Sequence, residues 1–191
     1  MTDLAERRGV ETDVYQPAED SHLLATVAAE QVGQDDLVLE VGTGSGYVAE
    51  HVATESGARV VASDLNPHAC RSARERGVET VRADLVSPFR DDAFDAVLFN
   101  PPYLPTDESE AWDDWMEVAL SGGETGRAVI DPFLRAVGRV LAPDGRVLLL
   151  VSSLTGVDEV VDTAATEGFS AAALRDESYP FESLTVLKLL R

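Results

Sequence analysis

The chain has 191 residues, and its 35 aspartates and glutamates outnumber its 15 lysines and arginines, which gives a formal net charge of −20. This length predicts one domain, residues 1–191, with a core that needs no covalent cross-link. The single cysteine, Cys70, excludes an internal disulfide and a multi-cysteine metal site. No stretch has the length of a membrane span or the pattern of a signal peptide, so we expect a cytoplasmic protein.

The acidic charge has two interpretations. It could form a surface for a basic partner, or it could reflect a halophilic, salt-rich cytoplasm in which carboxylates stay hydrated and salt screens their repulsion. The acids are scattered along the whole chain, which favours the second interpretation. Both make binding to nucleic acid unexpected, because a phosphate backbone requires clustered lysine and arginine, and Lys188 is the only lysine.

Residues 1–14 are polar and charged and are expected to form a loose N-terminal extension. After them, apolar periodicity and turn residues predict alternating helices and strands. In chain order these are a helix at 18–32, a strand at 36–41, a helix at 47–56, a strand at 59–64, a helix at 67–76, strands at 78–84 and 94–99, a helix at 127–141, a strand at 146–153, a helix at 157–167, and strands at 169–177 and 182–190.

The early strands are continuous apolar runs, which is typical of a parallel sheet covered on both faces. The last strand alternates, with Leu184, Val186 and Leu190 on one face, which indicates an antiparallel strand. We therefore predict a doubly wound, Rossmann-like α/β fold. Its seven-stranded sheet would be mostly parallel, with helices on both faces and the last strand antiparallel beside the fifth. Ligands of such sheets bind at the carboxyl ends of the strands, which is where the motifs below occur.

The first strand ends in Glu40 and a glycine loop that contains Gly42, Gly44 and Gly46. Glycines permit tight turns and the close approach of a ligand. The spacing G-x-G-x-G is not the dinucleotide fingerprint G-x-G-x-x-G, and no Gly-Lys-Ser/Thr of a P-loop follows. The loop could also be only a turn.

Acidic residues also end the next two strands. Asp64 could accept the two hydroxyls of a ribose or cap the following helix, with Leu65 beside it. Asp84 could accept an adenine amino group while Leu85 lies against the ring, or it could be a solvated loop residue. Together with Glu40 these acids disfavour phosphates and favour a cationic ligand with an adenosine group, such as S-adenosylmethionine.

The fourth strand ends in Asn100, Pro101, Pro102 and Tyr103. The proline after Asn100 favours extended backbone at Asn100. The side-chain amide of Asn100 offers both a hydrogen-bond acceptor and donors. The proline carbonyls have no neighbouring N–H groups, and the tyrosine offers a flat face. Such a pocket suits a planar amino group, which would be oriented toward the methyl group of the cofactor without a strong base. The alternative is a rigid loop.

These motifs resemble those of class I methyltransferases that modify planar amino nitrogens. The stretches "DVYQPAEDSHLL", "NPPY" and "SGGETGRAVIDPFL" resemble the HemK family, in its short archaeal and eukaryotic branch, which methylates the glutamine of the Gly-Gly-Gln loop in class 1 translation release factors. The resemblance covers nearly the whole chain. "NPPY" alone is shared with DNA and RNA methyltransferases, whereas "VYQPAEDS" is more specific.

The resemblance implies contacts of Ser21, the glycine loop and the three acids with S-adenosylmethionine, and of Asn100 with the substrate amide. It also implies that Tyr15, Gln16 and Pro17 close over the site. In this branch a small zinc-binding activator protein completes the enzyme, and we expect it at the third strand, Val78–Arg82, which would be an edge strand.

Other residues leave alternatives open. His22, His51 and His68 are dispersed and have no metal-ligand spacing. Trp112 and Trp115, with their acidic neighbours Asp113 and Asp114, could form a lid over the substrate or only pack the loop after Tyr103. The rival functions are methylation of adenine or guanine amino groups in nucleic acid, methylation of a small molecule, and a non-catalytic scaffold.

Overall fold

The computed structural model describes residues 14–106 and 115–191. Most of the expected N-terminal extension and the residues Trp112, Asp113 and Asp114 therefore lie outside the described residues. The helices are α1 Glu19–Gln31, α2 Tyr47–Ser56, α3 Pro67–Glu75, α4 Trp115–Leu120, α5 Ile130–Val137, the short 3-10 helix η3 Ser153–Thr155, and α6 Val157–Thr166. The strands are β1 Leu37–Val41, β2 Arg59–Asp64, β3 Glu79–Arg82, β4 Phe94–Phe99, β5 Leu141–Ser152, β6 Ser170–Ser178 and β7 Ser183–Leu190.

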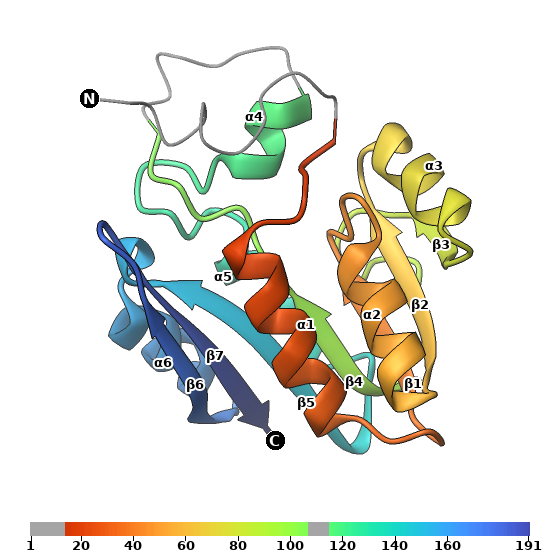
Figure 1. The fold of residues 1–191 in the computed structure, drawn as a ribbon. Helices are drawn as coiled ribbons and strands as arrows, with labels where there is room; N and C mark the ends of the chain where they lie inside the picture. Colours follow the sequence, from red (N-terminus) through yellow and green to blue (C-terminus); the bar gives the residue numbers. More distant parts are fainter. Residues whose placement is uncertain (1–13, 107–114) are drawn as a thin grey trace.

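The strands form one seven-stranded sheet in the order β3-β2-β1-β4-β5-β7-β6. The five strands from β3 to β5 in this order pair in parallel, and β7 is antiparallel to both β5 and β6. The predicted doubly wound sheet is confirmed, including the last strand inserted beside the fifth. Figure 1 shows β3 and β6 at the two opposite edges.

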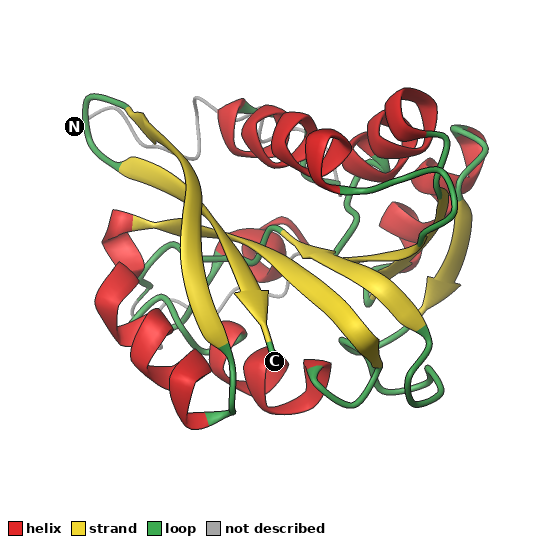
Figure 2. Cartoon of the chain, turned by 90° about the horizontal axis from the view of Figure 1, so that it is seen from below, coloured by secondary structure: helices red, strands yellow, loops and turns green. Residues whose placement is uncertain are grey.

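Helices cover both faces of the sheet (Figure 2). Successive residues of the central strands point to opposite faces, so each strand contributes to two cores. Val38 and Leu98 pack with α1 and α2, whereas Leu39 and Val97 pack with α5 and α6. Burial on both faces explains why these strands are apolar without alternation.

The prediction for the segment around residue 141 was wrong. We expected a helix to residue 141 that Pro143–Gly145 would end, but α5 ends at Val137 and β5 already begins at Leu141. Leu141 pairs with Phe94, and Arg146 pairs with Ala96, so the proline and glycine lie in an irregularity inside the strand. A bulge tolerates these residues because its backbone makes no regular ladder hydrogen bonds.

The prediction for β7 was correct in direction but wrong in its pattern of exposure. Leu184, Val186, Leu187 and Leu189 are all buried, whereas Leu190, which we placed on the same face as Leu184 and Val186, is 41% exposed. The cause is that both faces of β7 are covered, and Leu190 is the last residue of the strand.

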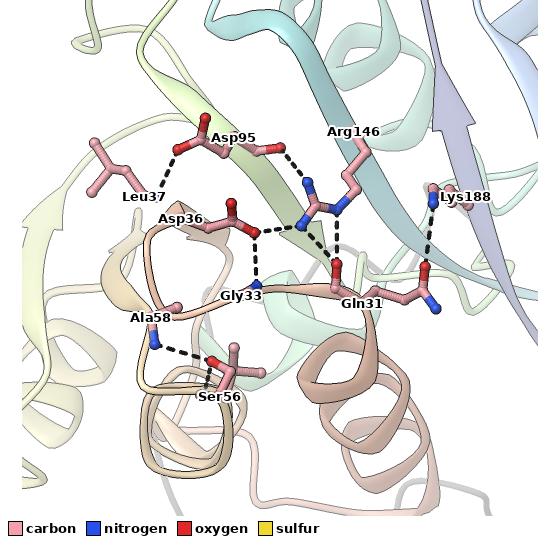
Figure 3. A network of polar contacts seen from close by, with 10 residues as sticks. Gln31, Gly33, Asp36, Leu37, Ser56, Ala58, Asp95, Arg146 and Lys188 are labelled. Atoms are coloured by element: carbon pink, nitrogen blue, oxygen red, sulfur yellow. Dashed lines mark hydrogen bonds and ion pairs between the residues drawn. The ribbon is translucent and has the colours of Figure 1, made fainter.

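Arg146 joins the ends of several elements at the amino edge of the parallel strands (Figure 3). Its guanidinium donates to Asp36 Oδ2 at 2.5 Å, to the Gln31 carbonyl at 2.6 Å and to the Asp95 carbonyl at 3.2 Å. The side chains of Arg146 and Asp36 are only 16% and 23% exposed. Burial alone would raise the pKa of Asp36, but the Gly33 N–H and the guanidinium hold it below its ordinary value. This cluster ties α1, β1, β4 and β5 together.

None of the helices in residues 14–106 and 115–191 is long and apolar enough to cross a membrane. Within the same residues, no group of three or more histidine, cysteine, aspartate or glutamate side chains could hold a metal ion. His22 is exposed, and its Nδ1 atom lies 2.7 Å from the hydroxyl of Tyr47.

Candidate active site

A cavity lies at the carboxyl ends of β1, β2 and β4, as the fold predicts. The first turn of α1 and the short helix α4 also contribute to its wall. Most of the residues singled out from the sequence line it, although they come from separate segments of the chain. These are Tyr15, Ser21, Glu40, Gly42, Gly44, Asp64, Leu65, Asp84, Leu85, Asn100, Pro101, Pro102 and Tyr103.

Pro17 and Gly46, which we expected to contact the cofactor, do not line the cavity. Gly46 has φ +84° at the start of α2, and a Cβ atom there would lie 2.7 Å from Ala73 Cα. The lack of a side chain at Gly46 therefore permits the close packing of α2 against α3. Pro17 precedes α1, and its neighbour Gln16 donates to the Val14 carbonyl instead of facing the cavity.

Glu40 is buried at the end of β1. Its Oε2 atom accepts hydrogen bonds from Thr43 Oγ1 at 2.5 Å and from the Ala49 N–H at 3.1 Å. Burial nevertheless dominates and raises the pKa of Glu40 to about 8. Near neutral pH this carboxyl is therefore protonated unless a cation enters the cavity.

Asp64 joins the glycine loop to the start of α3. Its Oδ2 atom accepts the Gly44 N–H at 2.9 Å, and its Oδ1 atom accepts the Asn66 N–H at 2.8 Å. Burial raises the pKa of Asp64 although these N–H groups oppose the shift. The cap of α3 is Asn66, which accepts the His68 N–H at 2.8 Å. Asp64 is therefore not the helix cap, and it lines the cavity.

Asn100 presents a buried acceptor at the end of β4. Its Oδ1 atom is shielded from solvent and accepts no hydrogen bond from any residue that the structure describes. An unpaired buried carbonyl costs about 1–3 kcal/mol, so such atoms usually face a ligand or water. The prolines that follow supply no N–H group that could satisfy it. The cavity wall thus includes a buried acceptor that receives no donor from residues 14–106 and 115–191.

The comparisons with known proteins agree with this geometry. A family model described as a methyltransferase domain matches residues 38–123. A Methanocaldococcus jannaschii protein, named for protein N5-glutamine methyltransferase activity, is 36% identical over 94% of this chain and 92% of its own length. The human methyltransferase HEMK2 is 32% identical over 96% of this chain and 92% of its own length.

A solved structure shows the same relationship in three dimensions. It is the Mtq2–Trm112 complex of E. cuniculi, described as responsible for methylation of the eRF1 translation termination factor. The match has 31% sequence identity and a TM-score of 0.79, and it covers 94% of this chain and 99% of that one. This chain belongs to the HemK methyltransferase family.

For a HemK methyltransferase, the implied cofactor is S-adenosylmethionine, a cation with an adenosine group. The cavity fits such a ligand, because three acidic side chains, Glu40, Asp64 and Asp84, line it while apolar residues form much of the rest, and a bound cation favours the ionised form of Glu40. Asp84 is exposed after β3, and Leu85 has φ +48° and packs partly on the core below. This placement is compatible with a loop that holds a flat ring at the rim.

Asp20 belongs to this HemK site although sequence reasoning missed it. It is buried in the first turn of α1, where its Oδ2 accepts the Tyr15 hydroxyl at 2.8 Å and its Oδ1 accepts the Ser21 N–H at 2.6 Å. Asp20 thereby holds Tyr15 and Ser21, two residues that line the cavity. The sequence "AEDS" contained a signal, because an acid in a first helical turn pairs with free N–H groups.

The HemK cavity extends beyond the Asn100–Tyr103 segment to α4, a helix that we did not predict. Trp115, Val118, Ala119 and Leu120 form this second wall, together with Val129. Trp115, Val118 and Ala119 have the i, i+3, i+4 spacing of one helix face, which was the available signal. Trp115 lines the cavity, which leaves both the lid and the packing interpretation open, and Trp112 lies outside the described residues.

Proposed function

We propose that the chain transfers a methyl group from S-adenosylmethionine to the side-chain amide nitrogen of a glutamine, in the Gly-Gly-Gln motif of a class 1 translation release factor. The observation that carries the proposal is the buried Asn100 Oδ1 atom, which has no hydrogen-bond partner among the described residues and lies in the wall of a cavity lined by acids. The names of the relatives support the substrate. The M. jannaschii relative is named for N5-glutamine methylation, and the E. cuniculi complex is described as methylating eRF1. Such a substrate is found in the cytoplasm, where we place the reaction.

Glu40, Asp64 and Asp84 are the residues that would hold the cofactor, with Ser21, Leu65, Leu85 and the glycine loop around it. When bound, S-adenosylmethionine supplies an activated methyl group on a sulfonium sulfur. The carboxylates of this chain suit its positive charges, and they would repel a phosphate-bearing nucleotide.

The Asn100–Tyr103 segment would hold the acceptor amide. Asn100 Oδ1 would accept one amide hydrogen. The carbonyl of Pro101, the next residue in the chain, would accept the other. Tyr103, only 3% exposed, limits how the planar amide can tilt. The nitrogen then faces the methyl group, takes it, and releases one of its hydrogens as a proton to water. Positioning and exclusion of water supply most of the rate enhancement, so no basic side chain is required.

The test is direct methylation. The purified chain, with and without a Trm112-type activator and at high salt, would be mixed with labelled S-adenosylmethionine and the release factor. Mass spectrometry should place one methyl group on the Gly-Gly-Gln glutamine. Label that enters transfer RNA, ribosomal RNA or DNA, with an unmodified release factor, would instead establish the rival nucleic-acid function.

We further propose that a small zinc-binding activator docks on the β3 edge of the sheet, as the sequence predicted for Val78–Arg82. Among the described residues β3 pairs with β2 alone, so its other edge could accept a partner strand. Leu65 and Val81, 46% and 36% exposed, lie beside this edge. Arg82, whose Nε donates to the Leu65 carbonyl at 3.0 Å, adds positive charge to an otherwise acidic protein. An acidic partner would complement this face.

Val81→Asp should weaken activator binding by about ten-fold or more, because it places a charge in the apolar part of the contact. Leu174→Asp on β6, which is also 36% exposed but lies at the opposite edge, is the matched control. Binding would be measured by isothermal titration calorimetry. Equal affinities for the parent and the two variants would exclude the β3 edge as the docking site.

Cofactor binding should depend on pH through Glu40. The carboxyl is protonated below pH 8 in the free protein, since burial raises its pKa to about 8, and a bound cation favours the ionised form. Affinity should therefore rise with pH up to about 8, and binding at pH 7 should release a proton. Calorimetry in buffers of different ionisation enthalpy measures that proton. Glu40→Gln should abolish the release, and a release that persists in this variant would assign it to another group.

A further inference from the structure

Behind the acceptor segment lies a turn of the chain that we call the brace, residues 121–126, with the sequence Ser-Gly-Gly-Glu-Thr-Gly. It follows α4 and precedes α5. Leu120, the residue before the brace, lines the cavity, but the residues of the brace do not. This stretch is part of the sequence that resembles the HemK family, but it has no role in the contacts with cofactor or substrate proposed above.

The brace is hydrogen-bonded to the residues that directly follow Tyr103. The Leu104 N–H donates to the Leu120 carbonyl at 3.0 Å, and the Gly122 N–H donates back to the Leu104 carbonyl at 2.8 Å. The Thr106 N–H donates to the Gly123 carbonyl at 3.0 Å. The pattern is a short parallel bridge between Leu104 and Ser121. It fixes the chain one residue beyond the Asn100–Tyr103 segment.

The hydroxyls of Thr106 and Ser121 lie 2.5 Å apart, which adds a side-chain link to this bridge. The Ala128 N–H donates to the Gly122 carbonyl at 2.9 Å, so the brace is also continuous with the start of α5. The backbone groups of Leu104 and Thr106, just after the Asn100–Tyr103 segment, are therefore paired with the brace and the end of α4 and not with the regular sheet.

Gly126 brings the brace into direct contact with the acceptor segment. A Cβ atom at this position would lie 2.7 Å from the Tyr103 carbonyl oxygen and 2.8 Å from Thr155 Cγ2. Gly126 also has φ +74°, and a Cβ atom at Gly122 would lie 2.6 Å from Gly126 Cα. The Tyr103 carbonyl belongs to the backbone and cannot rotate away as a side chain would, so any side chain here must displace the acceptor segment.

The other side of the brace is attached to the end of β5. Arg127 Nη1 donates to the Thr155 carbonyl, and Thr155 Oγ1 donates to the buried Ser152 carbonyl at 2.7 Å. The acceptor segment is thus clamped between its own strand, β4, and a turn that the adjacent strand β5 supports.

From this arrangement we propose that Gly122 and Gly126 are positioning residues for methyl transfer. They let the brace approach closely enough to hold Asn100 and Tyr103 in the geometry that aligns the substrate amide. This inference rests on the proposed function of the Asn100–Tyr103 segment. It predicts that damage to the brace lowers the rate of transfer and leaves cofactor binding intact, because residues 121–126 contact the chain after Asn100 and do not line the cavity where the cofactor acids lie.

Gly126→Ala is the decisive variant, and Gly168→Ala is its matched control. Gly168 has a similar φ of +87°, but nothing lies within 4 Å of an added Cβ atom, so this variant carries the backbone strain without the contact. We expect Gly126→Ala to lower kcat for the release factor by about 10²-fold, as small misplacements of reacting groups do, with the cofactor Kd within about two-fold of the parent. Gly168→Ala should keep kcat near the parent value.

Two further measurements keep the inference testable. Hydrogen exchange at the Leu104 and Thr106 amides should accelerate in Gly126→Ala and not in Gly168→Ala, a readout that needs no substrate. If Gly126→Ala does not fold, Thr106→Val and Ser121→Ala should each lower kcat and should be non-additive in combination. Equal kcat losses in Gly126→Ala and Gly168→Ala, or a parallel loss of cofactor affinity, would overturn the proposal. A parent enzyme that leaves the release factor unmodified would overturn the proposed function alone.

Discussion

Asn100→Ala is expected to abolish methyl transfer while the protein still binds S-adenosylmethionine. The Oδ1 atom of Asn100 is a buried acceptor with no partner among the described residues, and it lines the cavity, so we expect it to contribute when an N–H group of the substrate reaches it. Removal of one preorganised hydrogen-bonding group of this kind lowers kcat by about 10²–10³-fold. The measurements are kcat with the release factor and the cofactor Kd by calorimetry.

Asn66→Ala is the matched control, because Asn66 and Asn100 both precede a proline. Asn66 accepts the His68 N–H, caps α3 and lines the cofactor side of the cavity beside Asp64, so its loss should cost about 1 kcal/mol of folding free energy and change the cofactor Kd more than kcat. If Asn100→Ala weakened cofactor binding as much as it lowered kcat, Asn100 would hold the cofactor and not the acceptor amide.

Arg146→Met should destabilise the protein by about 3 kcal/mol, the largest effect that we expect outside the cavity. The substitution leaves the partly buried Asp36 carboxylate and two carbonyls without their common donor. Denaturant unfolding measures the loss. Arg59→Met removes an ion pair with Glu79 whose side chains are 69% and 58% exposed, and it should cost no more than about 1 kcal/mol.

The effect of Arg146→Met should depend on pH with a defined sign. The pKa of Asp36 is lowered in the folded protein, so its ionised form stabilises the fold above the ordinary value of 3.8. This contribution is lost as the pH falls through the lowered pKa. The difference between parent and variant should therefore be constant at neutral pH and shrink in acid. A difference that grows below pH 4 would contradict the assignment of Asp36 as the partner.

The central strands and the cavity residues at their ends were predictable from local pattern. Apolar runs such as Leu37–Val41 and Phe94–Phe99 indicate buried parallel strands, because both faces of such strands pack against helices. The carboxyl ends of parallel strands meet at one edge, so Glu40, Asp64 and Asn100 had to converge there. Chain order and the alternation of helix and strand were sufficient for this part of the site.

Other features depended on contacts between segments far apart in the chain. Gly46 looked like a cofactor residue, but the approach of Ala73 decides its role. Pro143–Gly145 looked like a helix end, but pairing with β4 draws these residues into β5. Asp20 belongs to the site because it binds the Tyr15 hydroxyl. α4 belongs to it because its residues line the same cavity as Asn100–Tyr103.

The amino-acid sequence alone therefore determined the class of fold, the family and most of the cavity-lining residues, because periodicity and turn chemistry act over a few residues. The tertiary structure decided which carboxyl is protonated, which acceptor lacks a donor and which turn supports the acceptor segment. Burial raises the pKa of Glu40, Asn100 Oδ1 has no partner in the part of the chain that the structure describes, and the absence of a side chain at Gly126 lets the brace contact Tyr103. Each of these depends on distances between atoms that no local pattern in a single sequence encodes.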